Sequence, residues 1–574
     1  MRWKLRKHNP LKAKKFIDEL GISHILAKAF AGREISFADI STLLKSPELL
    51  LENPLAIPGA EEAARTIVEQ AQKDDAEFWV FADYDVDGLT SGHVMNRILS
   101  VLVGEKNVHV YYPERTEGYG LNMEFVEAVI SHKKKTERNI AVVTVDNGIT
   151  KVAEIAKLQK NEIQCIVTDH HEPGDEYPSC PCCDAFLKKD GTGQHLCGAA
   201  IAWKVGILVR NIAKEIGVAE YGEMMEDLLP FVALGTIADV MPMTPENIAI
   251  VRIGLERLSD PSCKEAESLR KFAKIAGKPF PTAMDIAWEI APKLNACGRM
   301  GNTAKAASLF EEKDPDKLHE AMLDILDIDA ERKSLSKKAI EDARKSIEKE
   351  GNRNMVSFFN CSKYPAGING IVAGKLADIF GKPAIVYQVD LDGTCSGSMR
   401  GVRGVDMFNI LKEEECKGNV LSCGGHSDAA GVSFEDKMFF KLRDSLNDVI
   451  SKISVVQEEE PQIEVDAVIS LASLSSKTVA DIEKFPYDKM DFHSPIVAVK
   501  CEVLSTHRSR NNENNICFLV KDEYDTQKEI WAWGKGTEYE SLKKPKNIWL
   551  IGEIDRDFRN NKNVTMRIAG ISSC

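Results

Sequence analysis

Short apolar runs alternate with helix-length segments between residues 76 and 168. The apolar runs are EFWVFAD (77–83), NVHVYY (107–112), NIAVVTV (139–145) and IQCIVT (163–168). Segments with helical patterning, such as LTSGHVMNRILSVL (89–102), separate them. Strands that alternate with helices of about ten or more residues indicate parallel pairing. This part of the chain therefore predicts a parallel α/β sheet.

The rest of the sequence predicts further domains, because 574 residues are too many for one hydrophobic core. We expect a helical segment (1–75), the parallel-sheet domain (76–312), a charged connecting helix (313–352), a smaller α/β domain (353–453) and a β-rich domain (462–574). The run SVVQEEEPQ (454–462) predicts a linker. Short β patterns beyond it favour a small antiparallel barrel of the oligonucleotide-binding type.

The composition is that of an ordinary globular protein, with 44% hydrophobic and 28% charged residues. The net charge of −14 argues against nonspecific coating of a polyanion, but it permits a local basic channel. No long apolar run is present, either within the chain or after the basic N-terminus. We therefore expect no membrane span, no secretory signal and a cytoplasmic location. The 14 cysteines are then expected to be reduced thiols.

Acidic residues and histidines follow several of the apolar runs. They are Asp83, Asp85 and Asp87, then Asp146, then Asp169, His170 and His171, and finally Asp239 after VALGTIA (232–238). Parallel sheets bind ligands at the carboxyl ends of their strands. We therefore expect all these residues to lie at strand ends and to converge on one edge of the sheet.

Carboxylates this close together destabilise one another's charged forms, and divalent cations reverse that cost. Mixed Asp and His ligation suits manganese, and magnesium can bind through the oxygens alone. Two such ions, roughly 3.5–4 Å apart, serve in-line displacement at phosphorus. Taken alone, DxDxDG is more often a solvated turn or a calcium-type loop, and an HH pair is more often structural. Their joint occurrence at strand ends favours the metal site.

Several motifs resemble those of one enzyme family. DYDVDG, VDNG, TDHHEPG and GTIADVMP look like the four successive motifs of the DHH phosphoesterases, while APKLNACGRMG and EGYGLN (117–122) look like segments of their RecJ branch. GINGIVAGKL, CSGSMRG and CGGHSDAAG resemble the companion DHHA1 domain. The resemblance runs from about 50 to 435, and the terminal β segment lies where RecJ proteins carry an oligonucleotide-binding (OB) barrel.

The resemblance implies a metal-dependent exonuclease that hydrolyses single-stranded DNA from 5′ to 3′ into nucleoside 5′-monophosphates, in DNA repair or recombination. Two Mn²⁺ or Mg²⁺ ions are implied as cofactors. One alternative is a DHH phosphodiesterase for short oligonucleotides or cyclic dinucleotides, although such forms generally lack the barrel. Another is a noncatalytic DNA-binding replication scaffold, although such relatives lose several ligands that are present here.

The matching motifs also imply residue roles. The implied metal ligands are Asp83, Asp85, Asp87, Asp146, His170 and Asp239. Asp85 and Asp87 would ligate separate ions, with Asp146 bridging them. His170 and Asp239 would complete the second ion's shell, and Asp83 would support the first. His171 would contact the scissile phosphate.

A second implied group binds the substrate. Its members are Asn295, Arg299, Lys375, Ser398, Arg400 and His426. Guanidinium groups bind phosphate bidentately, which suits the two arginines. Lys375 stands where RecJ proteins often have an arginine, so the positive charge is kept but the bidentate hydrogen bonding of a guanidinium group is lost. IEKFPYDKMDFHSPI (482–496) lacks the glycine-rich PFGxGN segment expected before the barrel, so a reoriented or reduced barrel is expected, which puts strand loading more than catalysis in doubt.

Two further features leave alternatives open. The spacing of Cys180, Cys183, His195 and Cys197 permits a structural zinc site, but RecJ-like proteins do not generally need one, and free thiols are the favoured interpretation. Trp531, Trp533 and Phe558 could stack bases, although filling the barrel core is the more usual role. We expect a monomer that acts on single-stranded DNA, with a single-strand binding protein or a helicase as candidate partners.

Overall fold

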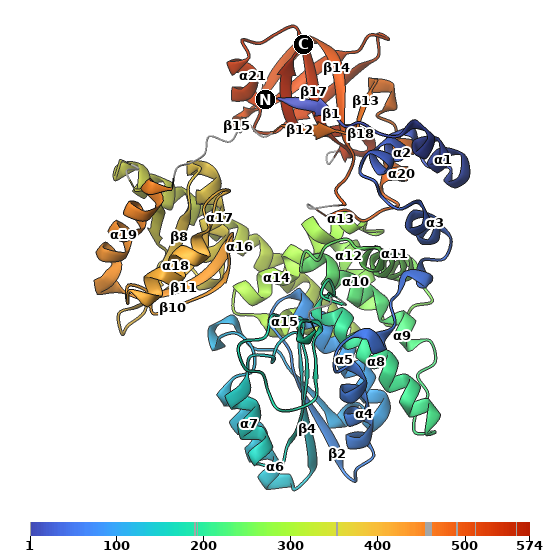
Figure 1. The fold of residues 1–574 in the computed structure, drawn as a ribbon, viewed down its shortest axis with the longest axis vertical. Helices are drawn as coiled ribbons and strands as arrows, with labels where there is room; N and C mark the ends of the chain where they lie inside the picture. Colours follow the sequence, from blue (N-terminus) through green and yellow to red (C-terminus); the bar gives the residue numbers. More distant parts are fainter. Residues whose placement is uncertain are drawn as a thin grey trace.

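The computed structural model describes residues 2–188, 191, 193–351, 354–453, 462–488, 492–510, 512–557 and 560–574. Residues 454–461 of the expected linker (454–462) and Phe558 lie outside these ranges. The parallel sheet and its helices lie at one end of the molecule, the C-terminal barrel at the other, and the second α/β unit to the side (Figure 1). No helix in the described ranges combines the length and the apolar character needed to cross a bilayer.

The predicted parallel sheet is present, with strand order β3-β2-β4-β5-β6. Its strands are β2 (Ala76–Phe81), β3 (Val108–Tyr111), β4 (Asn139–Val145), β5 (Gln164–Thr168) and β6 (Cys182–Cys183). Helices α4 (Ala60–Ala71), α5 (Val86–Val103) and α8 (Gly198–Glu215) pack on one face, and α6 (Met123–Thr136) and α7 (Val152–Lys160) on the other. Because helices cover both faces, the strands are apolar throughout rather than alternating.

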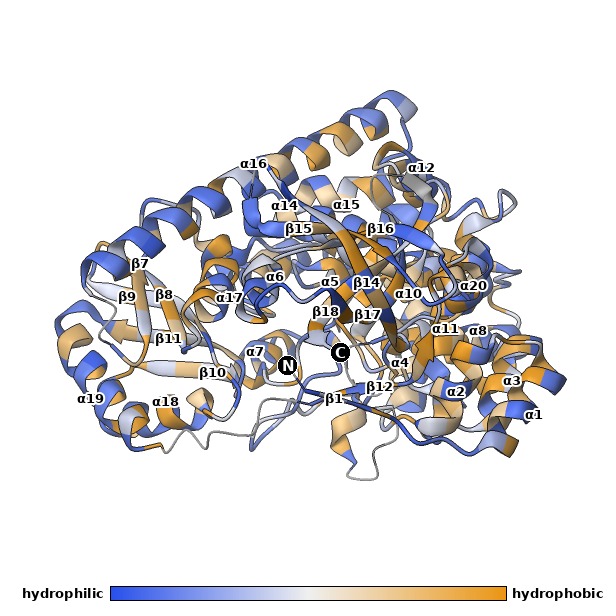
Figure 2. Cartoon of the chain, turned by 90° about the horizontal axis from the view of Figure 1, so that it is seen from above, coloured by the Kyte–Doolittle hydropathy of each residue, from blue (hydrophilic) through white to orange (hydrophobic). Residues whose placement is uncertain are grey.

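A group of helices follows the sheet. They include α10 (Leu229–Ala238), α11 (Pro245–Ser259) and α14 (Ala291–Arg299), and the charged connector forms α16 (Pro315–Lys349). Apolar and polar residues alternate by turns along α16, as Figure 2 shows. The expected strand before Asp239 is wrong, because VALGTIA belongs to α10. Neighbouring helices cover α10 on all sides, so its sequence has no polar face to reveal a helical period.

The second α/β unit is built on a five-stranded sheet of order β10-β11-β9-β8-β7. Its strands are β7 (Ser357–Asn360), β8 (Ala384–Val389), β9 (Thr394–Arg400), β10 (Ser422–His426) and β11 (Ala429–Glu435). Only β7 and β8 pair in parallel, and the other neighbours are antiparallel. Helix α17 (Asn369–Phe380) packs against this sheet and against α16.

The C-terminal strands form an antiparallel sheet of order β16-β15-β14-β17-β18, with β13 (Ala467–Ile469) parallel to β14. The strands are β14 (Ile496–Ser509), β15 (Asn512–Lys521), β16 (Gln527–Ala532), β17 (Asn547–Asp557) and β18 (Asn560–Ser573). Lys528 of β16 donates to the carbonyl of Val564 in β18, so the sheet curls until its outer strands approach. Helix α21 (Gly536–Ser541) lies between β16 and β17 in the chain, and this arrangement is the expected OB-like barrel.

The N-terminus contributes to the barrel domain, which the sequence did not indicate. Besides helices, it contains β1 (Trp3–Leu5), which pairs in parallel with β12 (Ile463–Val465). A three-residue strand is too short to show a period, and its partner is far away in sequence. The adjoining Asp466 is fully buried and accepts hydrogen bonds from Arg33 Nε (3.1 Å) and Ile496 N (2.9 Å). Asp466 also pairs with Arg6, at 3.2 Å.

Replacing Asp466 tests this connection. Asp466→Ala leaves the nearly buried Arg33 without its counter-charge, and we expect the barrel domain to lose about 3 kcal/mol of stability. Differential scanning calorimetry of the full chain would show this as a lower melting temperature. Glu464→Ala is the matched control, because Glu464 is 35% exposed and its removal should cost less than ~1 kcal/mol. Equal effects of the two substitutions would contradict the role given to Asp466.

Candidate metal centre and anion site

The first three acids lie where β2 passes into α5. Asp83 follows β2 and is buried. Asp85 is the N-cap of α5, where its Oδ1 accepts a hydrogen bond from Gly88 N at 3.0 Å. Asp87 lies in the first turn of that helix. The sequence alternates these acids because the chain must leave the strand, cap the helix and enter it within a few residues.

The other candidate ligands come from three later segments. Asp146 follows β4 with a φ of 60°, in the left-handed region, and is buried. His170 follows β5 at the same edge of the sheet. Asp239 is at the C-terminal end of α10, so a helix rather than a strand carries it to the group.

His170 lies at the middle of this group. Its Nε2 is 3.0 Å from Asp146 Oδ1, 3.7 Å from Asp87 Oδ2 and 3.8 Å from Asp239 Oδ2. Ligand atoms within 4.8 Å of one another form two sets around it: Asp83, Asp85 and Asp146, and Asp87, His170 and Asp239. Asp146 also belongs to a set with both histidines. The donors are therefore arranged as two adjacent sets, with Asp146 between them.

Two glycines allow this close packing. Asp87 accepts hydrogen bonds from Gly198 N (2.6 Å) and Ala199 N (3.0 Å) at the N-terminus of α8, a position that favours a negative charge. A Cβ atom on Gly198 would lie 2.6 Å from Cβ of Asp146, and one on Gly235 would lie 2.5 Å from Oδ1 of Asp87. Helices α8 and α10 could not approach the acids with larger residues at these positions.

The acids favour protonation when no cation balances them. Burial, and then the charge of Asp85, raises the pKa of Asp83 to about 8. Burial and the charge of Asp87 raise the pKa of Asp239 to about 8 as well. The pKa values of Asp85 and Asp146 are also raised, first by burial and then by Asp87. Carboxylate oxygens with one imidazole are a donor set that fits Mn²⁺, and the oxygens alone fit Mg²⁺.

His171 makes its closest polar contacts with Asp169 and Tyr119. Its Nδ1 is 2.8 Å from Oδ1 of the buried Asp169, and Tyr119 Oη is 3.0 Å from its Nε2. Burial opposes a charge on His171, but the hydrogen bond and charge of Asp169 outweigh it and raise the pKa of His171 to about 9. Neither Asp169 nor Tyr119 was expected to have a separate role, although Asp169 lies in the motif TDHHEPG and Tyr119 in EGYGLN.

Three arginines form a candidate anion site next to the acids. Arg299 ends α14 and donates to the carbonyl of Gly367 at 3.3 Å. Burial, and then the charges of Arg115 and Arg332, lowers its pKa to about 10. The pKa of Arg400, at the end of β9, is lowered by burial and by Arg115. In the described part of the chain, the three arginines contact a ring or backbone carbonyls, and no carboxylate forms an ion pair with them.

Arg115 is not among the residues that the sequence motifs predict for this site. Its guanidinium lies 4.4 Å above the ring of Tyr84, and its charge lowers the pKa values of Arg299 and Arg400. A basic residue shortly after β3 was the available signal, because this is another carboxyl end of the parallel sheet.

The remaining substrate candidates lie in different surroundings. Asn295 accepts a hydrogen bond from Val86 N at 3.1 Å, so it contacts the start of α5. Ser398 precedes Arg400 by two residues and faces the same side of β9. His426 is exposed and lies in register with Arg400 across β11. Lys375 is more than half exposed and lies 3.6 Å from Asp378.

The possible zinc ligands do not gather. His195 Nε2 is 3.0 Å from Glu246 Oε2, and Cys197 Sγ is 3.5 Å from Thr236 Oγ1. Cys180 is instead 3.8 Å from Cys182. Within the described ranges, no metal-ligand group includes a cysteine. Sequence spacing could not show that α8 carries Cys197 into the protein core, away from Cys180.

Trp531 and Trp533 do not fill the barrel core, which was the more usual role expected of them. Trp531 and Trp533 stack with ring centroids 5.1 Å apart, and Trp533 is 44% exposed. A hollow of about 180 Å³ beside them is lined by Arg556, Met566 and Arg567, among others.

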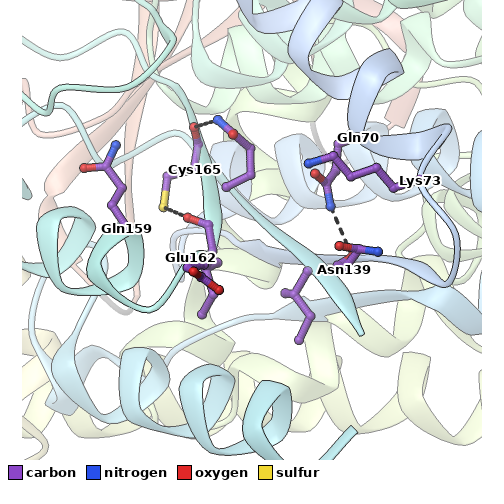
Figure 3. A pocket seen from close by; sticks show the side chains of 9 residues that line it. Gln70, Lys73, Asn139, Gln159, Glu162 and Cys165 are labelled. Atoms are coloured by element: carbon purple, nitrogen blue, oxygen red, sulfur yellow. Dashed lines mark hydrogen bonds between the residues drawn. The ribbon is translucent and has the colours of Figure 1, made fainter. Parts of the chain in front are cut away.

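Another hollow lies at the opposite edge of the parallel sheet, near the starts of β4 and β5. Figure 3 shows its lining, which includes Gln70, Asn139 and Cys165. Gln70 Nε2 donates to the carbonyl of Asn139 at 3.1 Å, and the hollow has a volume of about 290 Å³. None of the candidate ligands lines it, so it is separate from the metal centre.

Known proteins match both parts of the site. The family model described as "DHH family, N-terminal domain" matches residues 77–236, and that of the DHHA1 domain matches 354–453. The chain is 29% identical, over 98% of its length and 69% of the relative's, to the single-stranded-DNA-specific exonuclease RecJ of Bacillus subtilis (strain 168). These matches include the strands that carry the candidate acids and Arg400.

Solved structures share the fold. A crystal structure of RecJ in complex with Mn²⁺ from Thermus thermophilus matches 100% of this chain and 80% of its own, with a TM-score of 0.79 and 23% identity. A crystal structure of exonuclease RecJ bound to manganese matches 70% of this chain and 96% of its own, with a TM-score of 0.58 and 27% identity.

The raised pKa values make the stability of the metal-free protein depend on pH. Asp83 and Asp239 keep their protons up to about pH 8 when folded, whereas the unfolded chain releases them near 3.8. The folded state therefore binds more protons across this window, and stability should fall as the pH rises from about 4 to 8. Thermal unfolding with chelator should show a falling melting temperature over that range.

Saturating Mn²⁺ should remove this pH dependence, because cations favour the ionised carboxylates. The stabilisation by Mn²⁺ should therefore increase with pH, as measured by the difference between the two melting curves. A difference that stays constant from about pH 5 to 8 would contradict a metal centre at these acids.

Proposed function

Because this chain belongs to the RecJ branch of the DHH/DHHA1 family, we propose that it is a metal-dependent exonuclease that hydrolyses single-stranded DNA from the 5′ end. The observation that carries this proposal is the pair of adjacent Asp/His ligand sets next to three arginines without carboxylate partners in the described structure. One site can hold cations and the other can hold phosphate, as hydrolysis of a phosphodiester requires.

In this proposal, Asp83, Asp85 and Asp146 hold one Mn²⁺ or Mg²⁺ ion. Asp87, His170 and Asp239 hold the second, and Asp146 is shared. Two divalent cations held by these residues would supply Lewis acidity for an in-line displacement at phosphorus. The α8 N-terminus fixes Asp87 through two backbone amides, so its oxygens are held in place before a cation arrives.

His171 acts on the substrate rather than on the cations. The hydrogen bond and charge of Asp169 raise its pKa and hold Nδ1, which leaves Nε2 as a possible hydrogen-bond donor to the scissile phosphate. Asp169 holds the ring through Nδ1 of His171, and the hydroxyl of Tyr119 lies within hydrogen-bonding distance of Nε2. Asp169 and Tyr119 are therefore positioning residues in this proposal.

The arginines account for the polarity of the reaction. Arg115, Arg299 and Arg400 have no carboxylate partner in the described structure, so they can bind a terminal phosphate through guanidinium hydrogen bonds. Ser398 adds a donor on the same side of β9. A 5′-phosphate held there would place the first phosphodiester at the ligand sets, so nucleoside 5′-monophosphates would leave from that end.

The second α/β unit and the barrel complete the proposed enzyme. We assign catalysis to 76–312, phosphate binding to 353–453 and strand loading to 462–574, with the helix at 313–352 as the connector. The stacked Trp531 and Trp533 could serve strand loading. A cytoplasmic monomer in DNA repair or recombination, working with a single-strand binding protein or a helicase, fits this assignment.

Digestion of end-labelled single strands tests the activity. With Mn²⁺ or Mg²⁺, we expect the 5′ label to appear as mononucleotide before the 3′ label, and we expect no reaction with chelator. Asp146→Asn should lower the rate by about a hundredfold or more, because it removes a charge from both ligand sets. Asp175→Asn, an exposed carboxylate of the loop after β5, is the control. Early release of the 3′ label would refute the proposed polarity.

The anion site is tested with strands that differ only at the 5′ end. Arg400→Ala should raise KM about tenfold or more for a 5′-phosphorylated strand, and much less for a 5′-hydroxyl strand, because it removes charged hydrogen bonds to the phosphate. Arg400→Lys should recover part of the loss, since it keeps the charge without the fork. Arg443→Ala, which removes an arginine paired with Asp444 in the same unit, is the control. Equal effects on both strands would contradict a 5′-phosphate site.

A further inference from the structure

Two cysteines lie side by side near the edge of the parallel sheet. Cys180 and Cys182 have their sulfur atoms 3.8 Å apart, and both are free thiols. Cys180 lies in a bend, and Cys182, two positions later, is the first residue of β6; the short distance between the sulfur atoms shows that the two side chains face each other. Cys180 is partly exposed and Cys182 is 6% exposed, so a small reagent reaches the pair from the Cys180 side.

The distance is close to what a disulfide needs. A sulfur–sulfur bond is about 2.05 Å long, so the two atoms must approach by somewhat less than about 2 Å. Residues two apart in an extended chain have Cα atoms about 6.6–7.2 Å apart, at the upper end of the disulfide range. Closing the bond therefore draws in the backbone at Pro181, and a bond strained in this way is readily reduced again.

Backbone hydrogen bonds connect this segment to the metal centre. The carbonyl of Pro181 accepts from Val167 N at 2.9 Å, and that of Cys183 accepts from Asp169 N at 3.0 Å. On the other side, Gly59 has a φ of 75°, and a Cβ atom on it would lie 1.8 Å from the carbonyl oxygen of Cys182. The segment has no room to move toward α4, so a shift of its backbone acts on β5.

A shift of the backbone at Cys183 would move Asp169, because Asp169 N donates to the carbonyl of Cys183. Its Oδ1 accepts from His170 N at 2.8 Å and lies 2.8 Å from Nδ1 of His171. It therefore orients one residue of the ligand sets and the imidazole beside them. A displacement of the β5 end reaches both histidines through this one side chain.

We infer that Cys180 and Cys182 form a reversible redox pair, oxidised to a disulfide by low-molecular-weight disulfides, and that the oxidised protein is a weaker nuclease. The first half stands on the geometry of the thiols. The second half rests on the proposed function.

The exchange balances with a disulfide reagent RSSR. Cys180 loses its proton to solvent, attacks one sulfur of RSSR and releases RS⁻, which leaves a mixed disulfide. Cys182 gives its proton to that RS⁻, attacks the sulfur of Cys180 and expels the second RS⁻, which takes a proton from solvent. The two thiols lose two electrons and two protons, and RSSR becomes two RSH.

Thiol mapping tests the pair without any nuclease assay. The full chain with Mn²⁺ is equilibrated in mixtures of reduced and oxidised glutathione, alkylated, and mapped by mass spectrometry without reduction. We expect a Cys180–Cys182 disulfide that reverts with dithiothreitol. If both remain alkylated in mixtures that already modify the exposed Cys416 and Cys574, the redox pair is refuted.

Nuclease rates of the same samples test the coupling. Oxidation should lower the rate on single-stranded DNA about tenfold, the size of effect seen when a residue supporting metal ligands is disturbed, and dithiothreitol should restore it. Cys180→Ser should keep the reduced rate and lose the sensitivity, while the double variant Cys416→Ser, Cys574→Ser should keep the sensitivity.

The outcomes separate the two proposals. A disulfide that forms with no change in rate overturns the coupling. A reduced protein without nuclease activity contradicts the proposed function and leaves the thiol map to decide the redox pair. Should Cys180→Ser melt at a lower temperature than the parent protein, Cys180→Ala replaces it and the mapping of the unaltered chain stands as the decisive readout.

Discussion

Mutual repulsion among buried carboxylates is the constraint on which the rest of the structure depends. Asp83, Asp85, Asp87 and Asp146 come from two strand ends and raise one another's pKa values or those of their neighbours. The chain relieves part of this cost with its own groups: backbone amides of α8 bind Asp87, and the imidazole of His170 lies 3.0 Å from Asp146. These groups do not balance the total charge, so the arrangement favours a divalent cation.

The fold supplies the acids and the arginines from one continuous framework. Helix α14 shows this most directly, because Asn295 and Arg299 are four residues apart and share one face. Asn295 accepts from Val86 N at the start of α5, and Arg299 contacts Gly367 at the beginning of the second α/β unit. A single helix therefore fixes the distance between the metal centre and the anion site, and α16 carries the chain across to the second unit.

The sequence predicted those parts of the site that depend on strand ends. The sequence alone predicts that Asp85, Asp146 and His170 lie close together, because parallel strands place their carboxyl ends at one edge of the sheet. Asp239 was expected there for the wrong reason, since a buried helix has the same apolar sequence as a buried strand. The spacing also permitted a zinc set, which was the less favoured interpretation; in the structure Cys197, the N-cap of α8, contacts Thr236, and His195 pairs with Glu246.

Contacts between residues that are far apart in the sequence leave no pattern in the sequence itself. The pairing of β1 with β12 joins residues at opposite ends of the chain. Gly198 and Gly235 are ordinary small residues until the structure shows acids at the positions of their missing side chains. Arg115 is one of many charged residues, and its role depends on the proximity of Arg299 and Arg400.

The acids and arginines are close enough for the charge of Arg115 to oppose the rise in pKa that burial causes at Asp83 and Asp85, but they form no ion pair in the described structure, and the proposed function depends on this separation. If Arg115 paired with Asp83 or Asp85, the ligand set would lose its attraction for cations and the arginine its attraction for phosphate. Instead, its guanidinium lies over the ring of Tyr84, the residue between those two acids. A cation–π contact holds a guanidinium without cancelling its charge. In the proposed enzyme, Tyr84 thus acts as a spacer that leaves the acidic and basic groups their separate charges, within a chain whose net charge is −14.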